Sequence, residues 1–544
     1  MQRHVKLTDL TLAEKAAQMI VLSYRGQAET LAYVRQGIGG IWPCGLPGDN
    51  ADTFREAIRT LQEAAKIPLF ISADFENGAG QVMMDGSCTE FPGLMAFGAL
   101  NKSKAVKYAY AAGKVIAEEA MFLGINITPA PVADVNTEAQ NPITNTRSVG
   151  DNPMIVAAVS TAYARGMMKK GRLLPQVKHF PGAGMHKQDS HYGLEQMQVT
   201  REQMENIHLL PFRKAFRAGI PMLMTNHAIY PPYDNEYPAT LSYKIMTELL
   251  RNRMGFKGLA ITDAMAMHGI TSRYDGREAL ILAINAGNDL ILGPVEMKKA
   301  IERIVAAVQE GAIKEATINR AVERILHYKK KLLLFRHKLD LPGIRTPRHK
   351  REALSVRIAC ESITLARDRK NSLPLRPPLA GKVLVLEPEH PNHPFEWGLH
   401  FNLYGIMEAI KDCAPLVETQ LFGAHPDAAK IKTLLAHAQT AEVIFIGTAF
   451  RSKSGQTGLL TAGQVSLMKE INALGKTVVY IVSNPYVLAE LPFADTVLVA
   501  YGNNYTSIKA AADVVFGRIK PQGRLPVQIP DFIDPAIVKI LAHD

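Results

Sequence analysis

The sequence predicts an α/β protein of two domains, an N-terminal (β/α)8 barrel followed by an open α/β/α sandwich. Short apolar runs alternate with longer amphipathic stretches, and this alternation occurs in two separate blocks. The chain has 544 residues, which is more than the roughly 250 to 300 residues that one hydrophobic core accommodates. Apolar residues at 47% and charged residues at 21% are typical of a globular protein and argue against disorder or a fibrous structure.

The first block contains eight apolar runs of strand length. They are residues 18–22, 38–42, 68–74, 126–133, 174–179, 221–226, 258–263 and 289–292. Helical periodicity lies between most of them, at residues 52–65, 104–122, 155–169, 201–217 and 243–254. Eight buried strands with intervening helices predict a closed barrel over residues 1–340. The long gap between residues 74 and 126 predicts an elaborated loop.

The second block repeats the alternation with fewer strands. We expect strands at residues 382–386, 443–447, 477–482 and 497–500, and helices near residues 403–411, 428–437, 462–473 and 507–516. Four or five strands are too few to close a barrel, so an open parallel sheet covered on both faces is expected over residues 380–544. No GxGxxG or GxxxxGK[ST] motif opens these helices, so nucleotide binding is not indicated.

The positive charge of the chain is concentrated in one segment. The formal net charge is +11, and residues 329–351 hold nine Lys or Arg with one acid, a net +8. Pro342, Gly343 and Pro347 end helices, so we expect a helix tail that runs into an exposed basic linker at residues 341–379. A nucleic-acid site is the alternative interpretation, but a solvated linker explains the charge and no nucleic-acid partner is expected.

The composition also bears on compartment and on metals. No stretch approaches the roughly 18 consecutive apolar residues of a membrane span, and the first residues lead directly into a helical pattern, so a cytoplasmic protein with no membrane partner is expected. Four scattered cysteines, without CxxC or CxH spacing, predict buried thiols and no zinc site. No cofactor is expected, and the oligomeric state stays open.

Polar residues gather where the predicted barrel strands end. They are Asp74 with Glu76, Asp134 followed by Arg147, Lys178 with His179, Asn226 with His227, and Thr262 with Asp263. Reacting groups of a barrel sit at the C-terminal ends of its strands, so this distribution predicts an active site. Acids, cations and amides that converge on one ligand suit a neutral molecule with many hydroxyls, such as a sugar.

Several motifs carry a resemblance to a known family. Residues 178–184 and 189–191 together resemble the KHFPGxG(x4)DSH signature of glycoside hydrolase family 3 β-N-acetylglucosaminidases. Further matches, in order along the chain, are residues 37–41, Asp74 with Glu76 and Gly78, residues 91–92, 147–148, 238–242, 255–258, 262–265 and 523–527. The resemblance therefore covers nearly the whole chain and implies the barrel and sandwich fold of the two-domain members.

The resemblance implies a retaining mechanism and assigns its residues. Asp263 would be the nucleophile, and the His191/Asp189 pair would act as acid and base in place of a second carboxylic acid. An unperturbed pKa near 6.5 suits imidazole to both tasks. The structural alternatives are a helix N-cap for Asp263 and a solvated loop histidine for His191.

Substrate-binding roles also follow from the resemblance. Asp74, Arg147, Lys178 and His179 match positions that grip the hydroxyls of a terminal N-acetylglucosamine, and Asn226, His227 and Met265 are expected to line the same pocket. Alternatives stay open for three of these positions: Lys178 and His179 could be part of a buried ion pair, and His227 could be a satisfied core histidine. Asp134 either binds substrate or supports Arg147.

The chain departs from the family pattern at Ala183, Ala79, Val149 and Glu195, which leaves the exact sugar and leaving group open. We expect an exo-acting β-N-acetylhexosaminidase whose substrate is a cell-wall muropeptide or a related N-acetylglucosaminide, in peptidoglycan recycling. Alternatives within the family are a phosphorylase and a β-glucosidase that takes its acid from the second domain, at Glu389 or Glu396. A catalytically silent carbohydrate-binding protein or a nucleic-acid-binding protein are the alternatives outside catalysis.

Overall fold

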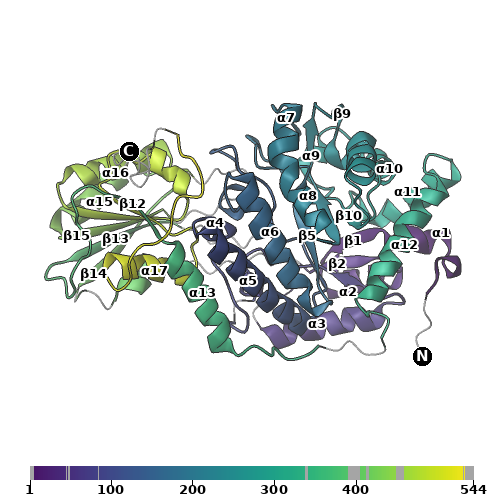
Figure 1. Ribbon diagram of the computed structural model, residues 1–544, viewed down its shortest axis with the longest axis horizontal. Coiled ribbons are helices and arrows are strands. Elements are labelled where there is room, and N and C mark those ends of the chain that lie inside the picture. The colour runs from purple at the N-terminus through teal and green to yellow at the C-terminus, as the bar shows by residue number, and fades with distance from the viewer. Residues whose placement is uncertain are drawn as a thin grey trace.

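The computed structural model describes residues 5–43, 46, 50–83, 85–336, 341–389, 405–411, 414, 416–448, 459–530 and 532. Figure 1 shows a barrel and an open-sheet domain side by side along the long axis of the molecule. The predicted fold class, a (β/α)8 barrel followed by an α/β/α sandwich, is confirmed. Glu396, Cys44 and Cys413 lie outside the described residues.

Eight parallel strands form the barrel, and each coincides with a predicted apolar run. They are β1 (Ile20–Ser23), β2 (Gly40–Trp42), β3 (Phe70–Ile71), β4 (Ile127–Thr128), β5 (Leu174–Phe180), β7 (Met222–Thr225), β10 (Leu259–Ile261) and β11 (Ile291–Leu292). Their order is β11-β1-β2-β3 in one half and β10-β7-β5-β4 in the other. Parallel bridges from Ser72 to Ile127 and from Ile261 to Leu290 join the halves into a closed ring.

Helices surround the ring because each parallel connection must return outside the sheet. They are α1 (Leu12–Gln18), α2 (Gln27–Arg35), α3 (Ala51–Ala64), α5 (Lys102–Leu123), α6 (Pro153–Met167), α7 (Arg201–Gln203), η5 (Met204–His208), α8 (Leu209–Arg217), η7 (Lys244–Arg253), α9 (His268–Thr271), α10 (Gly276–Ala286), α11 (Met297–Gln309) and α12 (Glu315–Lys331). The long gap before β4 holds η2 (Ala79–Gln81) and α4 (Leu94–Gly98) besides α5, which confirms the elaborated loop.

Shorter elements occupy the loops at the C-terminal end of the barrel. These are η3 (Asn145–Arg147), η6 (Ala239–Leu241) and a small sheet of β6 (Glu195–Gln196), β8 (Ala228–Tyr230) and β9 (Asp234–Pro238), and elsewhere η1 (Leu7–Asp9) and η4 (Met168–Lys170). The small sheet connects the segment after β5 to the segment after β7, so the loops that carry the predicted site residues are themselves ordered by backbone pairing.

The C-terminal domain is a six-stranded open sheet with helices on both faces. Its strands are β12 (Thr364–Asp368), β13 (Val383–Pro388), β14 (Val417–Phe422), β15 (Val443–Thr448), β16 (Thr477–Val482) and β17 (Thr496–Val499), in the order β12-β17-β16-β15-β13-β14. Its helices are α13 (Arg348–Ser362), α14 (Ile406–Ile410), α15 (Ala428–Thr440), α16 (Ala462–Ala473), η9 (Pro485–Ala489) and α17 (Tyr505–Val515). The expectation of four or five strands was too low, because β12 pairs antiparallel at one edge and β14 parallel at the other.

The segment predicted to be an exposed basic linker is largely folded, which corrects that expectation. Residues 341–379 contain α13 and the edge strand β12. Two of the cations that suggested a solvated segment are buried: Arg351 pairs with Glu119 on α5, and Lys329 on α12 donates a hydrogen bond of 2.8 Å to Gln18. The boundaries of 1–340 and 380–544 stay a prediction.

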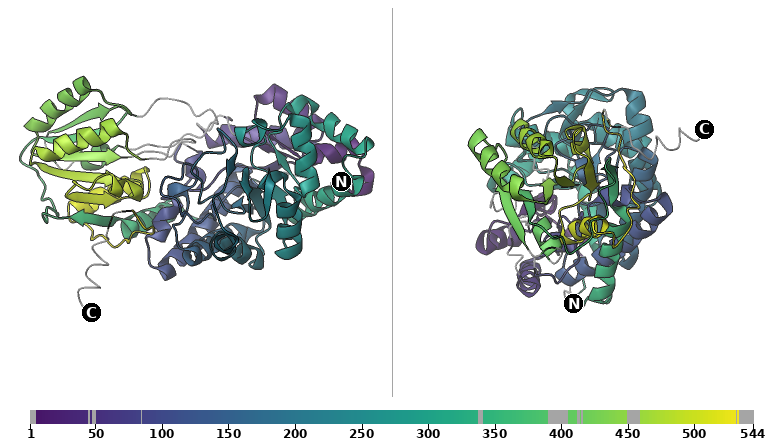
Figure 2. Two further views of the ribbon diagram at one scale, coloured as in Figure 1. Left: turned by 90° about the horizontal axis from the view of Figure 1, so that it is seen from above. Right: turned by 90° about the vertical axis from the view of Figure 1, so that its left-hand side faces the viewer.

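The two domains share an apolar cluster. Met95, Ala96 and Ala99 from the α4 region of the barrel pack with the face of the C-terminal sheet that α15 and α16 cover. Hydrogen bonds cross the same boundary, from Asn504 Nδ2 to Phe91 O (2.9 Å) and from Arg524 N to Ala99 O (3.0 Å). Figure 2 shows the two domains beside each other from above, and in Figure 1 α13 lies at the lower side of the boundary between them.

Candidate active site

The barrel strands bring the predicted site residues to one end of the ring. Asp74 follows β3, Lys178 and His179 lie at the end of β5, Asn226 follows β7, and Asp263 follows β10. All these strands are parallel, so their C-terminal ends open on the same face. The backbone thus gathers residues that are up to 189 positions apart in the chain.

Two acids and two cations form a cluster at this face, in which Asp74, Glu76 and Lys178 are buried and Arg147 is partly exposed. Lys178 Nζ lies 3.0 Å from Asp74 Oδ1 and 2.6 Å from Glu76 Oε1. Arg147 holds the same Glu76 carboxylate with two nitrogens, Nε at 2.9 Å and Nη2 at 2.7 Å. The two cations offset the cost of burying the two carboxyl groups, although burial still raises the pKa of Asp74 above its usual value.

Glu76 is the member of this cluster that the sequence placed at a strand end without assigning it a substrate-binding role. Burial disfavours its carboxylate, but the charges of Arg147 and Lys178 outweigh burial and hold the pKa of Glu76 well below its usual value. Glu76 is therefore an anion that orients both cations. The Asp74–x–Glu76 motif was the available signal, but only the fold shows that Arg147, 71 residues away, reaches it.

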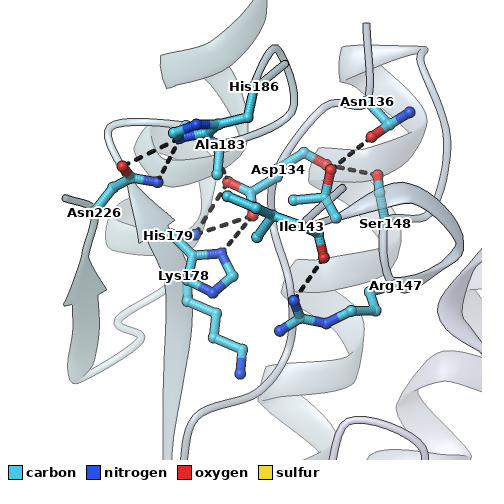
Figure 3. Close-up of polar contacts among 12 residues, drawn as sticks. Asp134, Asn136, Ile143, Arg147, Ser148, Lys178, His179, Ala183, His186 and Asn226 are labelled. Atoms are coloured by element: carbon cyan, nitrogen blue, oxygen red, sulfur yellow. Dashed lines mark hydrogen bonds and ion pairs between the residues drawn. The ribbon is translucent and has the colours of Figure 1, made fainter. Parts of the chain in front are cut away.

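Asp134 organises the backbone around His179 (Figure 3). Its carboxylate accepts hydrogen bonds from the backbone N–H of His179 (3.0 Å) and of Ala183 (2.7 Å), and Oδ2 lies 2.8 Å from His179 Nδ1. Asp134 is fully buried, and no contact with Arg147 is among its hydrogen bonds or ion pairs. The geometry favours a role in fixing His179 over direct substrate contact.

Asp189 and His191 form a hydrogen-bonded pair on the loop after β5. His191 Nδ1 lies 2.7 Å from Asp189 Oδ1, and the backbone N–H of His191 donates to the same oxygen at 2.8 Å. The His191 side chain is 33% exposed and that of Asp189 is 1% exposed. Burial opposes the imidazolium, but the hydrogen bond and charge of Asp189, with the charge of Asp263, raise the pKa of His191 above its usual value.

Asp263 is half-buried at the end of β10, and its Oδ1 accepts a hydrogen bond from the backbone N–H of Ala264 at 2.8 Å. Burial alone would raise its pKa, but the nearby imidazoles of His227, His179 and His191 hold the pKa of Asp263 below its usual value. The lowered pKa of Asp263 favours its carboxylate and the raised pKa of His191 favours its protonated imidazole, and each group contributes to the pKa shift of the other.

A second histidine pair on the same loop escaped sequence reasoning. The buried His186 places Nδ1 2.7 Å from Glu195 Oε2, and its Nε2 lies 3.2 Å from Asn226 Oδ1. Glu195 also accepts the backbone N–H groups of Lys187 and Gln188. These contacts tie both ends of the loop that carries His191 to the end of β7, beside Ala183 in Figure 3.

The other two predicted pocket residues are tightly packed. His227 uses both ring nitrogens within the protein, with Nδ1 2.8 Å from Thr240 Oγ1 and Nε2 3.1 Å from Ala264 O. Burial lowers the pKa of His227. Its contacts fit the alternative interpretation, a core histidine whose hydrogen bonds are made within the protein. Met265 is 1% exposed, and its backbone N–H donates to Leu292 O at 2.9 Å.

Fold and site together define a class of protein, a (β/α)8 barrel enzyme equipped for nucleophilic and acid–base chemistry on a polar ligand. The comparisons narrow this class. The profile of the Glycosyl hydrolase family 3 N terminal domain matches residues 11–328, and that of the Glycosyl hydrolase family 3 C-terminal domain matches residues 363–539. The chain belongs to glycoside hydrolase family 3, as the motifs indicated.

Relatives match over both domains. "Beta-hexosaminidase A" of Pseudoalteromonas piscicida is 29% identical over 86% of this chain and 84% of its own length. "Beta-N-acetylglucosaminidase/beta-glucosidase" of Cellulomonas fimi is 27% identical over 96% and 94%. The family 3 β-N-acetylglucosaminidase of Paenibacillus sp. str. FPU-7 has a TM-score of 0.85 at 29% identity and covers 96% of this chain and 99% of that one. A solved "Beta-glucoside phosphorylase BglX" has a TM-score of 0.81 at 25% identity, over 96% and 95%.

Within the part of the chain that the structure describes, no helix is long and apolar enough to cross a membrane. No group of three or more His, Cys, Asp or Glu is arranged to hold a metal ion in the same residues.

Proposed function

We propose that this glycoside hydrolase is an exo-acting, retaining β-N-acetylhexosaminidase that releases terminal N-acetylglucosamine. The observation that carries the proposal is the His191/Asp189 pair within electrostatic reach of the half-buried Asp263. β-Hexosaminidase activity in the names of two-domain relatives supports the sugar.

The proposed reaction has two steps. In the first, an oxygen of Asp263 attacks the anomeric carbon, the glycosidic C–O bond breaks, and His191 gives its proton to the departing oxygen. In the second, neutral His191 takes a proton from water, whose oxygen attacks the anomeric carbon and releases the Asp263 carboxylate. Asp189 orients the imidazole and stabilises its charged form.

Sugar hydroxyls would be held by the charged cluster. Asp74, Arg147, Lys178 and His179 supply charge-assisted donors and acceptors, and Glu76 keeps the two cations in place. Asn226, His227 and Asp134 would shape the pocket from behind, since their side-chain polar atoms are engaged within the protein. Met265 would do so through its buried side chain.

A muropeptide substrate and a cytoplasmic location complete the proposal. Both follow from the resemblance of the motifs to the β-N-acetylglucosaminidase branch of the family. Cys88 and Cys360, the cysteines that the structure describes, are free thiols, which suits a reducing compartment. Subcellular fractionation tests the location, and incubation with purified muropeptides tests the substrate.

A panel of 4-nitrophenyl glycosides tests the activity. We expect the β-N-acetylglucosaminide to be cleaved faster than the β-glucoside, and the first sugar seen by NMR to be the β-anomer. Asp263→Ala should lower kcat by more than about a thousandfold. Asp52→Ala, whose side chain is 89% exposed, is the control and should retain activity. Equal or faster cleavage of the β-glucoside refutes the sugar, an α-anomer refutes retention, and an active Asp263→Ala refutes the nucleophile.

Phosphorolysis is a second candidate, because a neutral imidazole does not repel an incoming phosphate as a carboxylate does. Structural similarity to a β-glucoside phosphorylase also favours it. Product analysis in phosphate buffer separates the two reactions, since a phosphorylase releases the sugar 1-phosphate and a hydrolase the free sugar.

A further inference from the structure

We infer that Tyr486, on the C-terminal domain, is a positioning residue for Arg147 in the barrel. Through this residue the second domain then contributes to the geometry of the sugar-binding cluster. The inference rests on the proposed binding role of Arg147. Tyr486 lies in η9 and is 4% exposed, and its hydroxyl oxygen lies 2.8 Å from Asn136 Nδ2, the donor of a hydrogen bond between the domains.

Asn136 links Tyr486 to the segment that carries Arg147. Its amide donates to Tyr486 and to Glu138 O (2.9 Å), and its Oδ1 accepts from Thr144 Oγ1 (2.5 Å) and from the backbone N–H of Asn145 (3.1 Å). The side chain is 1% exposed. Both amide hydrogens and the oxygen are thus engaged, so the orientation of Asn136 is fixed from four sides.

Asn136 holds the turn at residues 144–147, and this turn determines the position of Arg147. Asn145 has a φ of 38°, in the left-handed region that asparagine adopts more readily than most other non-glycine residues, and its backbone N–H is held there by Asn136. The following backbone N–H of Arg147 donates to Thr144 O at 2.7 Å, and Arg147 Nη1 donates to Ile143 O at 2.7 Å. A change in this turn therefore moves both the backbone and the guanidinium of Arg147.

The same loop is also packed between the second domain and the segment that leads to His191. Ala139 packs against the apolar cluster of the C-terminal sheet. The backbone N–H groups of Thr137 and Glu138 donate to Gly184 O, at 2.9 Å and 3.2 Å. The contact between the second domain and this loop therefore has an apolar part at Ala139 and a polar part at Tyr486. A Tyr486→Phe substitution removes the hydroxyl and leaves the apolar packing in place.

Tyr486→Phe in the full-length protein tests the inference. Its matched control is Tyr480→Phe, since Tyr480 is buried in the same domain and its hydroxyl donates to Met468 O, away from the barrel. We expect Tyr486→Phe to raise KM for the 4-nitrophenyl β-N-acetylglucosaminide about tenfold and to change kcat less than about threefold. Tyr480→Phe should leave both constants unchanged. Equal constants in the two variants overturn the inference.

Arg147→Lys tests whether Arg147 binds the substrate, and the double variant Tyr486→Phe/Arg147→Lys tests whether Tyr486 acts through Arg147. If Tyr486 acts through Arg147, Tyr486→Phe adds nothing to the KM of Arg147→Lys, whereas independent effects would multiply and overturn the route. An unchanged KM in Arg147→Lys would instead refute the binding role of Arg147. Crystal structures of Tyr486→Phe and Tyr480→Phe decide the positioning in either case. We expect residues 141–147 to shift and the contact between Arg147 and Ile143 to open in Tyr486→Phe alone, and an unmoved loop overturns the inference.

Discussion

The hydrogen bond between Asp189 and His191 controls how long the imidazole keeps its proton as the pH rises. Asp189 is the main group that raises the pKa of His191 against burial, which would lower it. The pair also contributes stability that is fully present below the unfolded-state pKa of about 6.5 and is lost as the pH rises through the folded-state pKa. Activity and stability thus depend on one contact.

Asp189→Asn should move the alkaline limb of the kcat/KM profile to lower pH. Burial is then opposed only by the charge of Asp263, so the pKa of His191 falls and the proton needed by the leaving group is lost at a lower pH. Asp275→Asn, which changes the N-cap of α10 outside the site, is the control and should keep the limb in place. The measurement is kcat/KM across pH with the 4-nitrophenyl substrate, and an unmoved limb in Asp189→Asn contradicts the assignment of His191 as the acid.

At this scale the sequence indicated which residues gather at the site but not which contacts they make. Asp74, Lys178 and Asp263 could be placed because each ends a predicted strand. The part played by Glu76 depends on a contact with Arg147 across 71 residues, and that of His186 on a loop conformation that returns to Glu195. Neither contact has a periodicity or a spacing that a single sequence displays.

Among the elements, the loop between β5 and β6 is packed unevenly along its length. Gly184 lies against the backbone of the segment after β4, where an added Cβ would overlap Val135 O. A Cβ at Gly193 in the same loop would meet nothing within 4 Å. The loop is therefore packed at its start and open near His191.

Gly184→Ala should destabilise the protein by about 1–3 kcal/mol or more, because the new methyl group forces the two loop backbones apart. It should also lower kcat, since the displaced loop carries His191. Gly193→Ala is the matched control and should change stability by less than about 0.5 kcal/mol. Urea unfolding and kcat measure the two effects, and equal behaviour of the variants contradicts this account of the loop.

Elements buried on both faces were predictable, and those at edges were not. The eight barrel strands and the inner strands of the sandwich are apolar runs, as expected when helices cover both faces. β12 has the sequence TLARD and β14 the sequence VETQLF, in which polar residues interrupt the apolar ones, and both lie at sheet edges. β12 was also concealed by its position just after a segment rich in cations, whose charge suggested solvent exposure.

For the whole molecule, the apolar cluster that both domains share predicts joint unfolding. Domain interfaces within a chain are often polar and permit motion, but Met95 on α4 is fully buried within the core of the neighbouring domain. The two domains should therefore lose their structure together.

Calorimetry should show one unfolding transition for the intact chain, and Met95→Ala should reduce the stability of that transition by about 2–5 kcal/mol. Met154→Ala is the matched control, since Met154 on α6 is 52% exposed, and it should have an effect below about 0.5 kcal/mol. Two separate transitions in the unaltered protein, of which Met95→Ala affects only one, would contradict joint unfolding.

The buried amine of Lys329 has a consequence for the proton balance of folding. It is fully buried, donates to Gln18, lies 5.0 Å from the Phe70 ring centroid, and pairs with no carboxylate among the residues described. Burial holds the pKa of Lys329 well below its usual value. Between that pKa and the value of about 10.4 in the unfolded chain, unfolding takes up a proton from solvent. Within this pH range, Lys329 therefore makes the free energy of unfolding of the barrel larger as the solution becomes more alkaline. Because the buffer supplies the proton, the measured heat of unfolding also depends on the ionisation enthalpy of the buffer.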